Sequence, residues 1–225
     1  MHLRKREGTV ERGILAILLI LGAAEVSLAR STEVGNGGDA VVCYKHIKPY
    51  VQLFDLYEGR VLRRHEVSYE FSKQADRAEA IFAKLEQLSA LRAQAYRRAY
   101  AEFSKQANFL LGVHLPDVKD SNEVVLPKGC EIEQMIIQLK PQFPGDFKYI
   151  VDMTLWQRLD EVNRFAAILH EVIYSEALRY GAKDSRGVRY LNALINSKQF
   201  MSLSEEEFCT SLAAAGLPCN YQEEQ

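Results

Sequence analysis

The chain has 225 residues, of which 48% are hydrophobic and 26% are charged, and its formal net charge is −2 at pH 7. That length and apolar content fit one globular domain with a sizeable buried core. The mildly acidic balance comes without a long basic run, which argues against a nucleic-acid partner.

Residues 1–29 have the pattern of a secretory signal peptide. Four basic residues precede a short apolar run at 14–24, and Ser27 and Ala29 are small residues at the two positions that a signal peptidase reads. The run is about half of the ~20 residues that a transmembrane anchor needs, and no later stretch is apolar enough to cross a membrane. We therefore expect cleavage after Ala29 and a single mature domain, residues 30–225, in the periplasm or outside the cell.

The four cysteines predict two disulfides in an exported chain. Cys209 and Cys219 are close in sequence with a chain reversal between them, which leaves Cys43 to pair with Cys130. A bridge that closes so long a loop should stabilise the fold by roughly 4 kcal/mol in the chain-entropy model. A metal site is the alternative, but the cysteines lack the close spacing that structural zinc sites use.

The mature chain opens with a Gly-rich segment, GNGGD at 35–39, followed by a predicted strand at 40–43. A phosphate-binding loop would normally lie between a strand and a helix, so we interpret this segment as a turn. Residues 49–60 predict either a short helix or a strand that ends at Gly59.

Residues 68–111 predict the longest helix, because apolar residues recur at helical spacing and no Pro or Gly interrupts them. The apolar spacing is not a strict heptad, so we expect this helix to pack along the domain or to break into a hairpin. The motif EFSKQA occurs twice, at 70–75 and at 102–107. It is either a chance resemblance between helix turns or a duplicated binding face.

The middle of the chain predicts a hairpin, since apolar runs at 130–139 and 147–153 flank a turn with two prolines. The C-terminal third predicts three helices, which begin near Thr154, after Asp184 and at Ser204. The first should end at Gly181, and Ser204 and Glu207 should form a capping box at the start of the third. The fold class is therefore α+β: a small antiparallel sheet, one long amphipathic helix and a C-terminal helical subdomain over about 154–219, held by two disulfides.

The stretch ILHEVIYSEA, residues 168–177, carries the main candidate for chemistry. In an H-E-x-x-H helix two histidines hold zinc and the glutamate activates the bound water. Here His170 and Glu171 match the first half, while Tyr174, a rare type of zinc ligand, replaces the second histidine. Zinc binding by His170 and Tyr174 with Glu171 as the catalytic base is one hypothesis, and a structural histidine at the edge of the core is the other.

A third zinc ligand would have to come from elsewhere in the chain. The available side chains are those of His46, His65, His114, Asp39 and Asp184.

Arg186 and Arg189 lie in the first turns of the helix after Asp184. A helix N-terminus with arginines suits a carboxylate or phosphate, which makes both residues candidates for ligand binding. Alternatively, Arg189 forms an internal ion pair with Glu171 or Asp184 across the two helices.

Three stretches, GNGGDAVVC, LPKGCEIEQ and LHEVIYSEALRYGAKDSRGVRYL, resemble an uncharacterised family of exported bacterial proteins. The resemblance implies bacterial origin and export, and it supplies no activity. From the sequence we predict a cell-envelope binding or interaction module for an envelope protein or polymer, with the repeated EFSKQA as its surface. The alternative is a metal-dependent hydrolase with a degenerate zinc box.

Overall fold

The computed structural model describes residues 32–36, 38–44, 49–67, 74–117 and 124–222, and the predicted signal peptide lies outside them. Within these residues the strands form two small sheets, a four-stranded one with the order β1–β6–β7–β4 and a three-stranded one with the order β3–β2–β5. The strands are β1 (Thr32–Asn36), β2 (Asp39–Cys43), β3 (Tyr50–Leu53), β4 (Ala107–Leu110), β5 (Cys130–Gln134), β6 (Ile136–Lys140) and β7 (Tyr149–Asp152). Neighbouring strands are antiparallel except for β4 and β7, which are parallel.

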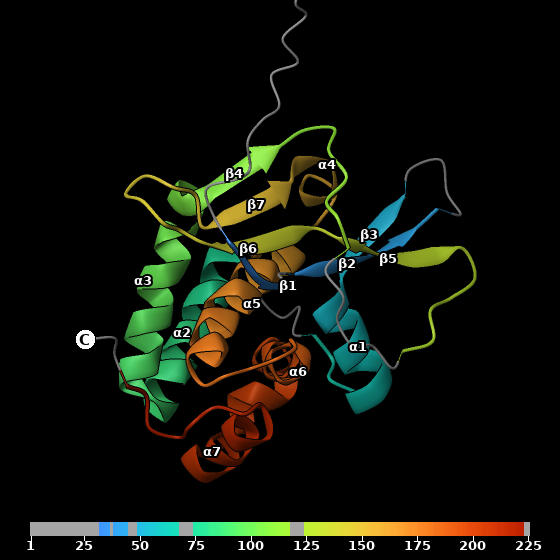
Figure 1. The fold of residues 1–225 in the computed structure, drawn as a ribbon. Helices are drawn as coiled ribbons and strands as arrows, with labels where there is room; N and C mark the ends of the chain where they lie inside the picture. The colour runs from blue at the N-terminus through green and yellow to red at the C-terminus, as the bar shows by residue number, and fades with distance from the viewer. Residues whose placement is uncertain (1–31, 37, 45–48, 68–73, 118–123, 223–225) are drawn as a thin grey trace, which may run out of the picture.

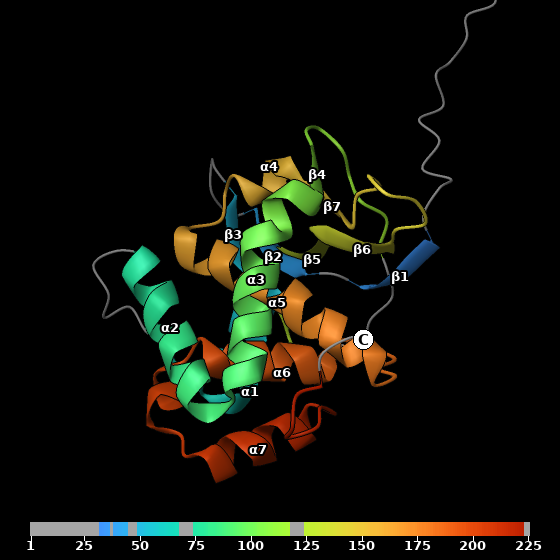
Figure 2. The same cartoon turned by 90° about the vertical axis from the view of Figure 1, so that its left-hand side faces the viewer.

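The larger helices lie below the sheets in the view of Figure 1, and Figure 2 turns the α2–α3 hairpin toward the viewer. The helices are α1 (Phe54–Arg63), α2 (Gln74–Leu88), α3 (Ala90–Gln106), α4 (Met153–Trp156), α5 (Glu161–Arg179), α6 (Arg186–Ile195) and α7 (Glu205–Ala214), with a 3-10 helix at Lys198–Ser202. The α+β class is confirmed. Among the described helices, none has the length and apolar character that crossing a bilayer requires.

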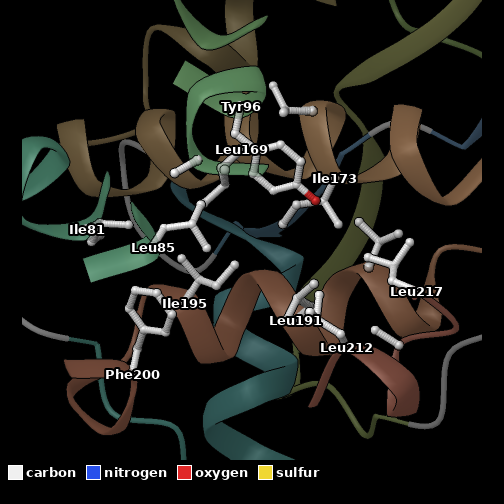
Figure 3. Close-up of a cluster of buried hydrophobic side chains, with 14 of the residues drawn as sticks. Ile81, Leu85, Tyr96, Leu169, Ile173, Leu191, Ile195, Phe200, Leu212 and Leu217 are labelled. Carbon is white, nitrogen blue, oxygen red and sulfur yellow. The ribbon is translucent and has the colours of Figure 1, made fainter. Parts of the chain in front are cut away.

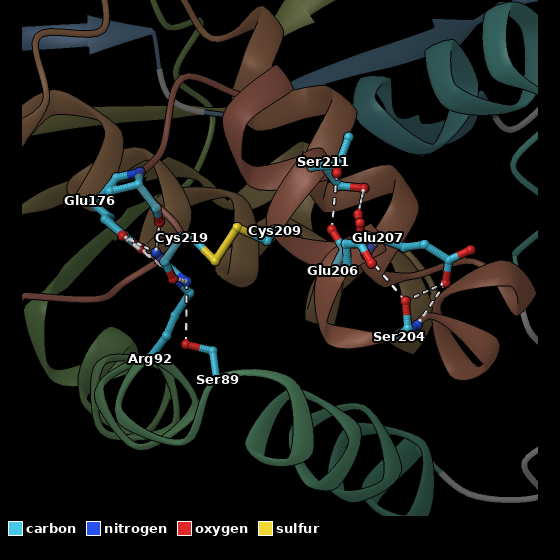
Figure 4. Close-up of a disulfide and its surroundings, with 11 residues drawn as sticks. Ser89, Arg92, Glu176, Ser204, Glu206, Glu207, Cys209, Ser211 and Cys219 are labelled. Carbon is cyan, nitrogen blue, oxygen red and sulfur yellow. Dashed lines mark hydrogen bonds and ion pairs between the residues drawn. A yellow bond between two sulfur atoms is a disulfide. The ribbon is translucent and has the colours of Figure 1, made fainter.

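Both predicted disulfides are present. Cys43 and Cys130 stand directly opposite each other on β2 and β5, with their Cα atoms 4.0 Å apart. Cys209 on α7 is bonded to Cys219 in the C-terminal tail, as Figure 4 shows. Disulfides of this kind are typical of proteins outside the reducing cytoplasm.

The two sheets are joined where the Gly-rich segment crosses from one to the other. The chain leaves the larger sheet at Asn36 and enters the smaller one at Asp39, and it returns between β5 and β6 at Met135. The carbonyl of Gly38 accepts the backbone N–H groups of both Met135 and Ile136, at 3.2 and 3.0 Å. The predicted turn is therefore the connection between β1 and β2, and Gly38 hydrogen-bonds it to the connection between β5 and β6.

The long helix expected over 68–111 breaks at Ser89, whose backbone is extended, and α2 and α3 pack as a hairpin. Its last residues, Ala107–Leu110, are not helical but pair with β7. Long-range strand pairing here overrides the local helical spacing. The first EFSKQA copy lies largely outside the described residues, and the second buries two of its six residues, Phe103 and Ala107, in the core.

Two further boundaries differ from the prediction. Residues 49–60 contain both a strand and a helix, and Gly59 does not end α1 but lies inside it, where an added Cβ would come within 2.4 Å of the Cβ of Ala193 on α6. The helix predicted to start at Thr154 is divided, because Asp152 caps α4 and Asp160 caps α5. Short acidic side chains at these positions accept the free N–H groups of each first turn.

The capping box of Ser204 and Glu207 is confirmed at the start of α7 (Figure 4). Gly181 has a φ of +79° just after α5 ends, as expected for a helix stop.

The main hydrophobic core surrounds α5. Leu169 and Ile173 of α5 pack with residues of α2, α3, α6 and α7, as Figure 3 shows. The labelled residues of this cluster are Ile81, Leu85, Tyr96, Leu169, Ile173, Leu191, Ile195, Phe200, Leu212 and Leu217. Because α5 is buried on most of its faces, it belongs to the centre of the whole domain, and its polar side chains must find partners inside the protein.

Candidate functional site

His170 lies in the interior of the protein and is bound to α1. Its side chain is 1% exposed, and its Nδ1 lies 2.8 Å from Oδ2 of Asp55, which is fully buried. The Asn192 side-chain amide donates to the same Asp55 oxygen at 2.6 Å and to the carbonyl of Ala166 at 2.9 Å. The histidine therefore connects α5 to α1 and, through Asn192, to α6.

The two charges of this pair stabilise each other. Burial lowers the pKa of His170, but the charge and hydrogen bond of Asp55 outweigh that effect and raise the pKa to about 9. Burial raises the pKa of Asp55, but the charge and hydrogen bond of His170 together with the Asn192 amide bring it below its ordinary value. His170 and Asp55 are therefore an imidazolium–carboxylate pair at neutral pH.

The network continues along α6 to α2. Asn196 donates to Oδ1 of Asn192 at 2.9 Å, and the Arg77 guanidinium donates to Oδ1 of Asn196 at 2.9 Å. Arg77 is 2% exposed. A chain of buried polar groups therefore links α1, α5, α6 and α2 through the core.

Glu171, the next residue of α5, contacts the Gly-rich segment. The side chain is fully buried, and its Oε1 accepts the backbone N–H of Gly38 at 2.7 Å. Burial raises the pKa of this carboxyl, against the opposing effects of the His170 charge and the Gly38 hydrogen bond. Two motifs of the sequence, GNGGD and LHE, thus meet in space across 133 residues.

Tyr174, the third residue of the zinc hypothesis, is 2% exposed, and its ring lies 5.9 Å from that of His170. Among the candidate third ligands, Asp184 pairs with Arg186, and His65 packs against the ring of Tyr190.

The other candidates are equally dispersed: His114 is near Glu133, Asp39 is buried in β2, and His46 lies outside the described residues. In the described part of the chain, no three His, Cys, Asp or Glu side chains gather as a group that could hold a metal ion. The metal and catalytic roles of His170, Glu171 and Tyr174 stay predictions.

A cavity of about 470 Å³ lies between α1, the start of α6 and the end of α7. Arg186 and Arg189, the two arginines that the sequence indicated, both line it, together with Arg63 from α1. The cavity brings basic side chains from separate parts of the chain to one concave surface, and neither His170 nor Glu171 lines it.

Arg189 forms an internal ion pair, which was the alternative to a ligand site. Its partner is Glu58, whereas the sequence had suggested Glu171 or Asp184. Its Nε and Nη2 donate to the two oxygens of Glu58 at 2.7 and 3.3 Å, and its Nη1 donates to Ser185 at 2.8 Å. The guanidinium also lies over the ring of Phe54, 5.1 Å from its centre. This buried fork fixes one wall of the cavity.

Arg186 and Arg63 are more exposed. Arg186 donates to Asp184 at 3.0 and 3.2 Å, and the hydrogen bond with Arg186 lowers the pKa of the Asp184 carboxyl. Arg63 lies over the ring of Tyr190 at 5.2 Å and makes no ion pair within the described residues. Of the three arginines, Arg63 therefore has the guanidinium that a bound anion can reach most directly.

Sequence reasoning missed Glu58, Arg63 and Tyr190. The predicted element ended at Gly59, so Arg63 fell outside it, although Glu58 and Leu62 have the four-residue spacing of one helix face. The spatial meeting of α1 with α6 depends on the close approach at Gly59. No local sequence pattern predicts this contact between α1 and α6.

No protein-family model matches this chain, and no curated protein or solved structure matches it either. The fold and the cavity therefore describe the molecule: a disulfide-bonded α+β protein whose helical side has a cavity lined by three arginines and two acidic residues.

Proposed function

We propose that the protein is an exported binding module of the cell envelope and that the cavity between α1, α6 and α7 is its ligand site. The observation that carries the proposal is the meeting of Arg63, Arg186 and Arg189 around one cavity. Its volume of about 470 Å³ lies within the roughly 300–1,000 Å³ that small-molecule pockets occupy. The two disulfides support a location outside the cytoplasm.

The chemistry of the lining supports a ligand with a carboxylate or phosphate group. A guanidinium presents a planar set of N–H donors that matches such an oxyanion. Arg189 is paired with Glu58 and Arg186 with Asp184, so in this proposal the two pairs shape the site, while Arg63 contacts the ligand directly. The ligand is then a component or fragment of the envelope, and His170 and Glu171 hold the scaffold together.

The test is a titration of the oxidised chain with inorganic phosphate, citrate and trialanine, followed by calorimetry. We expect at least one probe to bind and its affinity to fall about tenfold, or 1.4 kcal/mol, in Arg63→Gln. The matched control is Arg60→Gln, since Arg60 lies on the same helix, stacks on Tyr57 and does not line the cavity. If no probe binds, or if both variants weaken binding equally, the cavity is not the site.

The metal-dependent hydrolase stays a separate prediction that the same preparation can test. Metal analysis of the purified chain should find no stoichiometric zinc if His170 and Glu171 serve the scaffold alone. Zinc that disappears in His170→Ala would support the hydrolase instead.

A further inference from the structure

The Cys209–Cys219 disulfide lies at the surface, next to a hollow that is open to solvent. Cys219 is exposed and Cys209 is partly exposed, and both line a shallow depression of about 520 Å³ beside α7. The other disulfide, Cys43–Cys130, joins two paired strands and packs against a hydrophobic cluster. Because exchange begins when an external thiolate reaches a disulfide sulfur, the bridge at α7 is the more accessible of the two.

The tail that carries Cys219 is attached to the domain by more than this bridge. Arg92, which lies beside the disulfide in Figure 4, donates to the carbonyls of Pro218 and Cys219 at 2.7 and 3.2 Å. Leu217 is 3% exposed, and its backbone N–H donates to the carbonyl of Leu212 at 2.8 Å. None of these contacts involves a sulfur atom. The two thiols therefore stay close together after reduction, and the bridge can form again.

The hollow beside the disulfide is acidic. Glu205 and Glu206, exposed in the first turn of α7, line it together with the two cysteines. Glu205 precedes Cys209 by four residues, so the two side chains lie on the same face of the helix. Negative charge at this place repels an anionic thiol and attracts a thiol that carries positive charge. The hollow therefore favours a reductant whose surroundings are basic.

We infer that this bridge is a thiol–disulfide exchange site for an external dithiol with basic surroundings, a role that goes beyond the proposed ligand site and does not rest on it. A thiolate of the dithiol bonds to Sγ of Cys219, the more exposed cysteine. The bond between the two cysteines breaks, and its electron pair leaves on Cys209, which takes a proton from water. The second thiolate of the partner then attacks the partner's own sulfur and releases Cys219. The partner is oxidised to a disulfide, and this chain is reduced to two thiols.

The experiment treats the oxidised chain with dithiothreitol, cysteamine or 3-mercaptopropionate, traps the thiols with iodoacetamide and identifies them by mass spectrometry. We expect Cys209–Cys219 to open at least about tenfold faster than Cys43–Cys130. Per thiolate, cysteamine should open the bridge at α7 at least about threefold faster than 3-mercaptopropionate does. Glu205→Gln combined with Glu206→Gln should remove this difference between the two thiols.

The matched control for charge is Glu86→Gln combined with Glu161→Gln, because these two glutamates are also exposed but do not line the hollow. This control should keep the preference for cysteamine, and an equal loss in both double variants would refute the charge selection. Equal opening rates for the two disulfides would overturn the exchange site. So would loss of the cooperative urea transition when the bridge at α7 alone is open.

Two single variants identify the attacked sulfur. In Cys209→Ser, Cys219 should form a mixed disulfide with cystamine faster than Cys209 does in Cys219→Ser. The reverse order would overturn the assignment of Cys219 as the attacked residue.

Discussion

The buried pair of His170 and Asp55 should make the stability of the protein depend on pH in the alkaline range. The pKa of His170 rises from 6.5 to about 9 on folding, so the folded state holds a proton that the unfolded state releases. At about 1.4 kcal/mol per pH unit, this contribution is on the order of 3 kcal/mol. It is fully present below pH 6.5 and is lost as the pH rises through about 9.

The assay is the free energy of unfolding by urea, measured at intervals between pH 6.5 and 9. We expect it to fall across this range in the native chain and to become much flatter in His170→Gln, which keeps a polar side chain but cannot be protonated. The charged groups that act on His170, namely Asp55, Glu171 and Arg189, remain in both proteins. All four cysteines are in disulfides, so thiol exchange should not contribute. An equal slope in the variant would refute the assignment of the proton to His170.

Three further predictions concern the scaffold and use the same unfolding measurement. Glu171→Ala should lower the free energy of unfolding by about 2–4 kcal/mol, because it leaves the buried N–H of Gly38 without an acceptor and opens a cavity. Glu171→Gln keeps an acceptor and should cost much less. Gly59→Ala should destabilise by about 1–3 kcal/mol despite the better helix propensity of alanine, since the new methyl group would overlap Ala193; an increase in stability would contradict the close approach of α1 and α6. Arg92→Met should cost about 3–5 kcal/mol by leaving the Glu176 carboxylate buried and unpaired, and adding Glu176→Leu should recover most of the loss; a double variant no more stable than the single one would argue against the pair.

The last of these predictions depends on how the C-terminal tail is held. Arg92 donates to the carbonyls of Pro218 and Cys219, at 2.7 and 3.2 Å, and it binds Glu176 at 2.9 Å. Figure 4 shows Arg92 between Glu176 and the tail residue Cys219. The tail that carries Cys219 is therefore fixed twice, by the disulfide to α7 and by the guanidinium of α3. Removing either attachment alone should leave the other in place.

The sequence predicted the features whose determinants are local. The capping box at Ser204 and the helix stop at Gly181 depend on residues a few positions apart, and the hairpin of β6 and β7 on strands joined by one short connection; each is confirmed. The pairing of Cys43 with Cys130 is a long-range contact, but it followed once the other two cysteines were assigned to each other.

The failures have a common physical reason. Ala107–Leu110 has helical spacing, yet it is a strand because β7 lies beside it. A glycine often ends a helix, yet Gly59 lies inside α1. Ala193 of α6 packs so close to it that a side chain at position 59 would overlap. In both cases a distant segment determines the local conformation, and a pattern read within one window does not contain that segment.

For the candidate site, too, the sequence predicted local features and missed the contacts made by distant segments. Arg186 and Arg189 were identified because arginines at a helix start are visible in the sequence, but their surroundings were not. The internal partner of Arg189 is Glu58, which is 131 residues away. For the zinc hypothesis, the sequence placed His170 at the edge of the core, whereas the structure buries it in the interior and gives its Nδ1 the partner Asp55.

The crossing at Gly38 has a consequence for how the chain is made. A ribosome completes β1 and β2 first, yet β2 pairs with β5, β1 pairs with β6, and Gly38 is held by Glu171, which is synthesised 133 residues later. β2 can pair with β3 early, but β1 must wait for β6 and Gly38 for Glu171, and contacts of such high sequence separation form slowly. The crossing at Gly38 can therefore close only in a chain that has been synthesised as far as Glu171.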